Sequence, residues 1–250
     1  MSEPPSWAPL DRALEEAIAP LRRGRSPLVV LFSGGVDSGL LAWELRDRPG
    51  ASLFTAGVPG SDDLEQARTA APSIGLPWEA ASLSENDLLE VVSACGSELG
   101  SLPLPRASIF LGLAAAFARA PAPTLVCGQG ADELFLGYAH FRGLAAPEAA
   151  ARAAADLERL THDDWPRTQR LAARWRRTVV APFLDPVFVA AATAVPIESR
   201  LPTPGAKSLW RAWARSRGLP AAIAERPKRA LQYGTGVERW LRRRAARPVS

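Results

Sequence analysis

A short apolar run that leads directly into a pair of glycines constrains the fold of this chain more than any other feature. Leu28 to Phe32 (LVVLF) is typical of a buried parallel strand. The residues that follow, 33–38 (SGGVDS), bend the chain sharply and open a helix predicted over Val36–Arg46. Because a buried strand that turns at once into a helix begins a β-α-β unit, we expect a parallel sheet.

The same alternation of strand and helix continues as far as Cys127. Further strands are predicted over Ala51–Val58, Trp78–Leu83 and Thr124–Cys127. Apolar residues at helical spacing predict helices over Leu10–Leu21, Asp62–Ile74 with Ser61 as its cap, Glu85–Ser93 and Leu104–Arg119. This pattern indicates an α/β fold with a doubly wound parallel sheet, covered by helices on both faces.

The second half of the chain has a different sequence pattern, with no clear strand after Tyr138. Helices are predicted over Pro147–Leu160, Gln169–Val180, Pro186–Val195 and Ser208–Arg217. We therefore expect a helical layer on one side of the sheet. The predicted organisation is an N-terminal helix (1–24), an α/β core (25–140) and a helical subregion (141–250) that completes the same unit.

Composition excludes several classes of protein. Of the 250 residues, 47% are hydrophobic and 22% charged, which predicts a packed core rather than disorder. The longest apolar run, Ile109 to Ala118, is too short to span a bilayer, and no secretory signal is visible. The two cysteines, Cys95 and Cys127, form no CxxC pair. We expect a cytoplasmic protein with no membrane contact, iron–sulfur cluster or structural zinc.

The net charge of +4 does not by itself indicate a nucleic-acid partner. Almost all of the positive charge comes from arginine, since Lys207 and Lys228 are the only lysines. We interpret these arginines as a solvated surface rather than a nucleic-acid patch.

The loop at residues 33–38 has the features of a phosphate-binding site. Its two glycines let backbone N–H groups approach a ligand, and the following helix N-terminus and the serine hydroxyls favour an anion. Asp37 would repel a bare phosphate, which suggests a Mg²⁺ ion between the two. The alternative is a strand-to-helix turn with a capping side chain. We favour the ligand site because parallel sheets bind ligands at the carboxyl ends of their strands.

A second acidic loop follows the fourth predicted strand. Residues 128–135 read GQGADELF, with Gly137 and Tyr138 behind them. If the strand order reverses at the first strand, the first and fourth strands are neighbours, and Asp37 and Asp132 face one another across a crevice. Two such carboxylates can clamp Mg²⁺ onto a triphosphate. Considered alone, this loop could equally place acidic residues at a helix N-terminus to complement its dipole.

Together the two loops resemble the asparagine synthetase family, including the β-lactam synthetases. The first loop alone is similar to the pyrophosphate loop of the N-type ATP pyrophosphatases, a superfamily that also includes tRNA-thiolating enzymes. Further segments agree in order and spacing, namely 56–61 (AGVPGS), 182–185 (PFLD), 226–228 (RPK) and 234–236 (GTG). The resemblance covers about residues 25 to 240.

The resemblance implies roles for individual residues. Asp37 and Asp132 match Mg²⁺-binding carboxylates, and Lys228 matches a lysine that stabilises charge on the α-phosphorus. The residues that match the pyrophosphate loop are Ser33, Gly34, Gly35 and Ser38, and those that match backbone contacts to AMP are Leu31, Ala56 and Gly128. The resemblance also implies ATP and Mg²⁺ as cofactors, and a Rossmann-like core of the adenine nucleotide alpha hydrolase type.

Two departures from the family pattern limit these implications. Met1 is followed by Ser2 rather than by the cysteine nucleophile of the full-length enzymes, so we expect no intrinsic glutaminase activity. The nitrogen would then come from ammonia, another amine or a separate glutaminase subunit. Gln129 replaces a glutamate that can take a proton from the attacking amine, which a neutral amide cannot do. Asp185 and Glu133 are the candidate replacement bases, unless the amine arrives already deprotonated.

The leading hypothesis is an amide ligase that adenylates a carboxylic acid, by default aspartate, releases pyrophosphate and transfers the acyl group to ammonia or an amine. A ligase for a different acid or amine is the first alternative, and Gln129 supports it. A non-catalytic ATP-binding partner subunit is the second, and Asp37, Asp132 and Lys228 argue against it. A tRNA-modifying enzyme is the third, and the missing CxxC argues against it.

Overall fold

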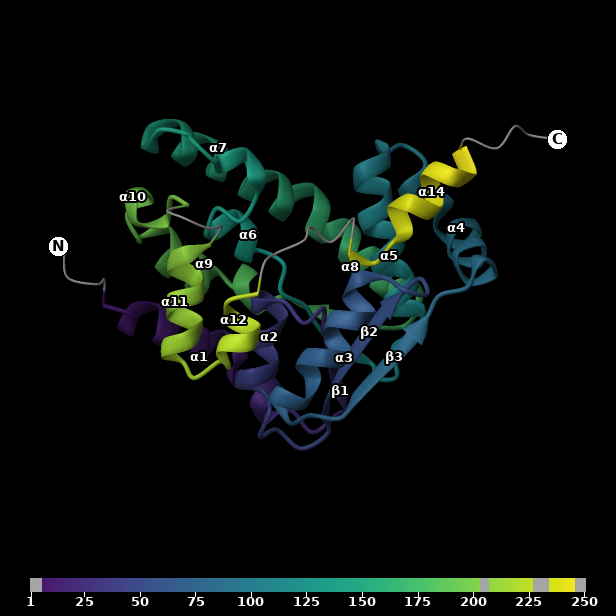
Figure 1. The fold of residues 1–250 in the computed structure, drawn as a ribbon, viewed down its shortest axis with the longest axis horizontal. Helices are drawn as coiled ribbons and strands as arrows, with labels where there is room; N and C mark the ends of the chain where they lie inside the picture. Colours follow the sequence, from purple (N-terminus) through teal and green to yellow (C-terminus); the bar gives the residue numbers. More distant parts are fainter. Residues whose placement is uncertain (1–5, 203–206, 227–233, 246–250) are drawn as a thin grey trace.

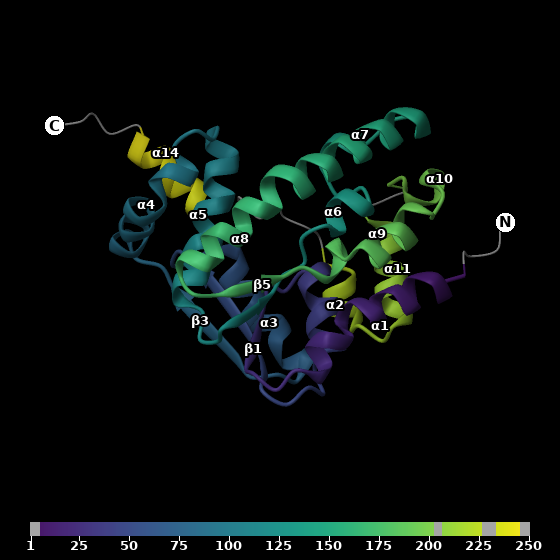
Figure 2. The same cartoon turned by 180° about the vertical axis from the view of Figure 1, so that it is seen from behind.

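The computed structural model describes residues 6–202, 207–226 and 234–245 of the chain. Its centre is a parallel sheet in the order β3-β2-β1-β4-β5 (Figures 1 and 2). The strands are β1 (Leu28–Leu31), β2 (Ala51–Gly57), β3 (Trp78–Ser82), β4 (Thr124–Val126) and β5 (Thr178–Val180). The order reverses at β1, so β1 and β4 pair directly, as predicted.

Helices surround the sheet and account for most of the remaining described chain. In the first half they are α1 (Ala8–Arg23), α2 (Val36–Glu44), α3 (Asp62–Ile74), α4 (Glu85–Leu99), α5 (Leu104–Arg119) and α6 (Ala131–Leu134). In the second half they are α7 (Ala146–Arg159), α8 (Trp165–Arg174), α9 (Pro186–Thr193), α10 (Ile197–Arg200), α11 (Ser208–Ser216), α12 (Ala221–Ala224) and α14 (Val237–Ala245). Short 3₁₀ turns cover Ala139–Phe141 and Pro182–Leu184, and a π-helical turn, Leu160–Asp164, joins α7 to α8.

Side chains along the strands alternate between two apolar cores, one on each face of the sheet. On β1, Leu28 and Val30 enter one core and Val29 enters the other. Residues of α1, α2, α3, α9, α11 and α12 complete the first core, and residues of α4, α5, α8 and α14 complete the second. The second half of the chain thus supplies helices to both faces, and the prediction that they lie on one side is wrong.

A strand also occurs where a helix was predicted over Gln169–Val180. Helix α8 ends at Arg174, Arg176 adopts a left-handed conformation (φ 55°), and Thr178 then pairs with Thr124 of β4. The run TVV suits a strand because β-branched residues pack well on a pleated surface. Three residues are too few to show the alternation of apolar and polar side chains that identifies a strand in a sequence. The formation of this strand depends on its pairing with β4.

Two smaller differences concern helix ends. Helix α4 continues to Leu99, beyond the predicted Ser93. Ser61 does precede α3, but its side chain makes no capping hydrogen bond, and its buried Oγ has no partner among the described residues. Gly57 makes room for this hydroxyl, since a Cβ there would lie 2.3 Å from it.

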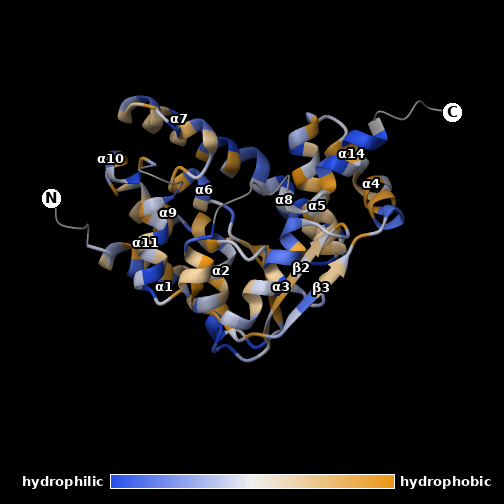
Figure 3. Ribbon diagram, viewed as in Figure 1, coloured by the Kyte–Doolittle hydropathy of each residue, from blue (hydrophilic) through white to orange (hydrophobic). Residues whose placement is uncertain are grey.

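None of the described helices is both long and apolar enough to cross a membrane. The apolar helix α5 instead packs against the sheet, with α4 and α14 beside it. Figure 3 shows the contrast between α5 and the mostly hydrophilic α14 that adjoins it.

Candidate active site

The loop between β1 and α2 forms a tight cradle at the carboxyl end of the sheet. Gly34 has a φ of +72°, and a Cβ there would lie 2.8 Å from the carbonyl oxygen of Gln66 and 2.9 Å from Nη1 of Arg226. Only glycine fits this conformation without displacing its neighbours. Gly35 precedes α2 and no side chain caps that helix, so no capping side chain competes with a ligand for its first N–H groups.

Hydrogen bonds among the loop's own residues fix its shape. Ser38 Oγ accepts from the backbone N–H of Ser33 at 3.2 Å, and the two hydroxyl oxygens are 3.4 Å apart. Arg226 Nη1 donates to the carbonyl oxygen of Ser33 at 2.9 Å. Hydrogen bonds therefore join the predicted pyrophosphate-loop residues into one structural unit. Arg226, the first residue of the RPK segment, is bonded to this unit.

Two carboxylates converge on one buried ammonium group at this edge of the sheet. Lys207 Nζ lies 2.6 Å from Asp37 Oδ1 and 2.9 Å from Asp132 Oδ1. The lysine side chain is fully buried, whereas each aspartate retains about a fifth of its exposure, at 21% and 20%. Trp210 Nε1 also donates to Asp37 Oδ1, at 2.8 Å. The structure thus brings together the two predicted metal ligands, with a cation held between them.

Lys207 stands at the start of α11 in a left-handed conformation (φ 60°). Burial lowers the pKa of Lys207, but the carboxylates of Asp132 and Asp37 outweigh burial and raise it above its ordinary value. The ammonium therefore stays charged and balances one of the two carboxylates. No motif in the sequence marks this residue. The one sequence feature that sets it apart is its type, because only two of the 30 Lys and Arg residues are lysines.

Two glycines in the second loop leave room for this cluster. A Cβ on Gly137 would lie 1.8 Å from Asp132 Oδ1 and 2.3 Å from Lys207 Cε. A Cβ on Gly128 would lie 3.0 Å from Asp37 Cβ. The glycines at both positions therefore let the second loop pack directly against Asp37, Asp132 and Lys207.

The candidate bases occupy different environments. Glu133 is buried, and Tyr138 donates to its Oε1 at 2.5 Å; burial and the neighbouring Asp132 raise the pKa of Glu133 to about 7. Gln129 Oε1 accepts from Cys127 Sγ at 3.5 Å. Asp185 Oδ1 accepts from the backbone N–H of Val187 at 2.9 Å, so it caps α9. Lys228 lies outside the described residues.

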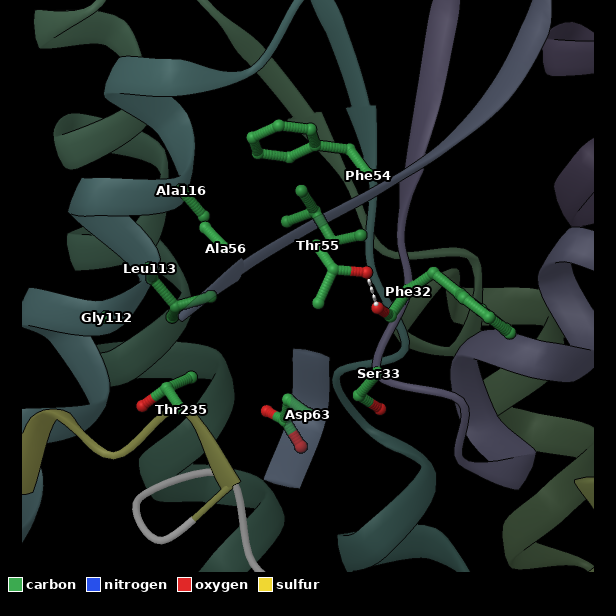
Figure 4. Close-up of a pocket in the computed structure, with 11 residues that line it drawn as sticks. Phe32, Ser33, Phe54, Thr55, Ala56, Asp63, Gly112, Leu113, Ala116 and Thr235 are labelled. Atoms are coloured by element: carbon green, nitrogen blue, oxygen red, sulfur yellow. Dashed lines mark hydrogen bonds between the residues drawn. The ribbon is translucent and has the colours of Figure 1, made fainter. Parts of the chain in front are cut away.

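A pocket beside the loop is lined by two of the three residues predicted to contact AMP, Leu31 and Ala56 (Figure 4). It is lined by Leu31, Phe32, Ser33, Phe54, Thr55, Ala56, Asp63, Gly112, Leu113, Ala116 and Thr235. Gly128 does not line this pocket. The Thr235 carbonyl accepts from Val58 N at 3.0 Å, so the GTG segment lies on the turn that follows β2.

Asp63 is a buried carboxyl in this pocket that the sequence did not single out. It points into the space beside Ser33 and Thr235 (Figure 4), and a Cβ on Gly234 would lie 2.2 Å from its Oδ1. Burial raises the pKa of Asp63 to about 7, although the nearby Arg226 opposes that rise.

We expect Asp63 to make folding pH-dependent. Its pKa is higher in the folded chain than in the unfolded chain, so the folded state binds the extra proton between about pH 4 and pH 7. The free energy of unfolding should therefore fall as pH rises through that window, by up to roughly 4 kcal/mol from this group. Asp63→Asn should remove this part of the decline, measured by urea unfolding at several pH values. Parallel profiles for the variant and the parent would contradict the assignment, and Glu65→Gln, at an exposed position on the same helix, is the control.

Comparison with known proteins identifies the family of the chain. The model of the asparagine synthase family matches residues 9–155 and 144–249. The chain belongs to the asparagine synthase family. It is 28% identical over 270 residues to the putative asparagine synthetase [glutamine-hydrolyzing] 1 of Methanocaldococcus jannaschii, covering 93% of this chain and 50% of that protein. It is 30% identical over 221 residues to the asparagine synthetase [glutamine-hydrolyzing] of Gallus gallus, covering 82% of this chain and 39% of that protein.

This asparagine synthase family member spans half or less of the length of these relatives. Among solved structures, it is similar to the NH3-dependent NAD synthetase from Campylobacter jejuni, with 15% identity and a TM-score of 0.38. That match covers 68% of this chain and 93% of the synthetase.

The donor atoms at the carboxylate pair suit a hard cation. Asp37 and Asp132 offer oxygen ligands, which Mg²⁺ prefers, and they already hold a positive charge, the ammonium of Lys207. Within the described ranges, no group of three or more His, Cys, Asp or Glu side chains could hold a metal ion. A metal ion here would therefore need phosphate oxygens or water to complete its coordination.

Proposed function

We propose that this chain is an ATP-dependent amide-forming ligase that adenylates a carboxylic acid with release of pyrophosphate, then transfers the acyl group to ammonia or an amine. The observation that carries the proposal is the convergence of Asp37 and Asp132 on one buried cation. This pair adjoins the 33–35 loop, and Ser33 of that loop also lines the pocket with Leu31 and Ala56. On this proposal, the polyphosphate site and the adenine pocket share one loop.

In the first step, a carboxylate oxygen of the acid attacks the α-phosphorus of ATP. The bond from that phosphorus to the bridging oxygen breaks, and pyrophosphate leaves. The N–H group of Gly34 and the N-terminus of α2 would bind the departing anion. Asp37 and Asp132 would hold Mg²⁺, which when bound offsets the negative charge of the phosphates.

In the second step, the amine attacks the acyl carbon, AMP leaves, and the amine nitrogen loses a proton. Gln129 cannot accept that proton. Asp185 and Glu133 stay the candidate acceptors, and Asp185 already accepts the N–H of Val187. Family membership supports aspartate and ammonia as the default substrates. Gln129 favours the second candidate, a ligase for a different acid or amine.

The test is pyrophosphate release from ATP and Mg²⁺ with purified protein. Aspartate is tried first, followed by a panel of acids, each with and without ammonium. We expect release that depends on one acid, with the amide formed only when the amine is present. Aspartate-dependent release with asparagine as product would fix the default substrates, and release with another acid would support the second candidate. ATP binding without release for any acid would contradict the ligase proposal.

A further inference from the structure

A second pocket is lined mainly by residues of α6, α7, α9 and α10, which lie near one another in Figure 2. Its volume is about 510 Å³, and it shares no lining residue with the nucleotide pocket of Figure 4. The walls are mostly apolar, with Leu157 from α7 and Val189 from α9. Volumes of this size are typical of small-molecule sites.

A buried cation that forms no ion pair within the described residues lines this pocket. Arg200 is only 9% exposed and lines the pocket. Its Nη1 donates to the carbonyl oxygen of Leu134 at 3.0 Å, while its buried Nε has no hydrogen-bond partner in the described part of the chain. Burial lowers the pKa of Arg200, and the charge of Glu198 opposes this only in part. Because an unpaired buried charge costs several kcal/mol, the site favours binding of an anion.

Two carboxyl groups also line the pocket, those of the buried Glu133 and the exposed Glu158. Glu133 is 6% exposed, lines the pocket, and accepts one hydrogen bond from Tyr138. Within the described ranges, no ion pair joins Glu133 to Arg200, so each charge is available to a ligand that spans both. The hydroxyl of Thr193, on the wall, donates to a carbonyl of its own helix at 2.7 Å. The buried ionisable groups of the pocket are therefore Arg200 and Glu133.

We propose that this pocket binds a free α-amino acid with an apolar side chain, its carboxylate on Arg200 and its ammonium on Glu133. A zwitterionic head complements the two opposite charges, and the apolar walls complement the side chain. The inference goes beyond the proposed function because it concerns a separate pocket that shares no lining residue with that of Figure 4, although Glu133 is also a candidate proton acceptor in the proposed second step. Glu133 directly follows Asp132 on α6, so an occupant of the pocket contacts the helix that carries a predicted metal ligand.

Binding is tested by calorimetry on the full chain without ATP. Leucine is compared with 4-methylpentanoate, which lacks the ammonium, and with isopentylamine, which lacks the carboxylate; phenylalanine serves as a larger probe. We expect saturable binding of an amino acid and at least tenfold weaker binding of the truncated analogues. Arg200→Met should weaken amino-acid binding at least tenfold, and Arg200→Lys should restore part of it. Arg12→Met, at an exposed position on α1, is the control.

A second variant tests the proposal in case Arg200→Met does not fold. Ala150 is exposed and lines the pocket, so Ala150→Trp should fill it without disturbing the core. No saturable binding of any common amino acid up to about 10 mM would overturn the proposal, since that limit corresponds to negligible affinity. Binding that survives both Arg200→Met and Ala150→Trp would also overturn it.

Measurement of pyrophosphate release then shows whether the bound amino acid is a substrate of the ligase or an effector. If the amino acid is a substrate, Arg200→Met should raise its KM while ATP binding stays unchanged. If it is an effector, turnover should persist in the variant and only the response to the amino acid should disappear. Either result supports the site. Because binding is measured without ATP, failure of the ligase proposal leaves this test intact.

Discussion

Replacing Asp132 with asparagine is expected to reduce pyrophosphate release by about 10³-fold. The substitution keeps the shape of the side chain but removes one of the two carboxylates that surround the cation site. The affinity for AMP should change little, because AMP lacks the β- and γ-phosphates and Asp132 does not line the nucleotide pocket. Steady-state release assays and AMP titration measure the two effects separately.

Stability needs its own control, because Asp132→Asn also removes a partner of buried Lys207. The double variant Asp132→Asn with Lys207→Met also leaves Asp37 without its cation, so it should be less stable than Asp132→Asn but more stable than Lys207→Met, without recovering activity. Asp163→Asn, in a partly exposed ion pair with Arg106, should leave turnover unchanged. Retention of more than about a tenth of the parental rate in Asp132→Asn would contradict a catalytic role for this carboxylate.

The first half of the fold could be predicted because its signals are local. A buried strand, two glycines and a helix start are contiguous in residues 28–44, and each element is recognisable within a few residues. The adjacency of β1 and β4 was also predictable, since two ligand-binding loops can meet only if the strands before them are neighbours. The proximity of Asp37 and Asp132, which both contact Lys207, follows from that topology.

The features that escaped prediction depend on contacts between distant residues. β5 is only three residues long and depends on pairing with β4, about fifty residues earlier. Lys207 is separated from Asp37 by 170 residues, and no spacing rule relates the two. Arg200 lacks a motif altogether, because its significance is its burial, with an Nε that has no hydrogen-bond partner among the described residues. Burial of a single polar residue depends on tertiary packing, which periodicity does not encode.

The second large effect is expected from Lys207→Met. The ammonium is fully buried between Asp37 and Asp132, so the neutral variant leaves two carboxylates facing each other without a cation. Loss of one partner from a buried ion pair costs about 3–5 kcal/mol, which corresponds to a fall in Tm of roughly 10 °C for a chain of this length. Added Mg²⁺ should restore much of that loss, because it can bind between the two carboxylates.

The parent should respond less to Mg²⁺ alone, since the ion must first displace the ammonium. The difference between the Mg²⁺-induced Tm shifts of variant and parent therefore measures the competition between Mg²⁺ and the Lys207 ammonium, and it requires no activity assay. Arg215→Met is the matched control, because Arg215 lies on the same helix in an exposed ion pair with Glu225. That variant should change stability by about 0.5 kcal/mol or less and should respond to Mg²⁺ as the parent does. Equal Mg²⁺ shifts for Lys207→Met and the parent would show that the ammonium and the metal ion do not share one site.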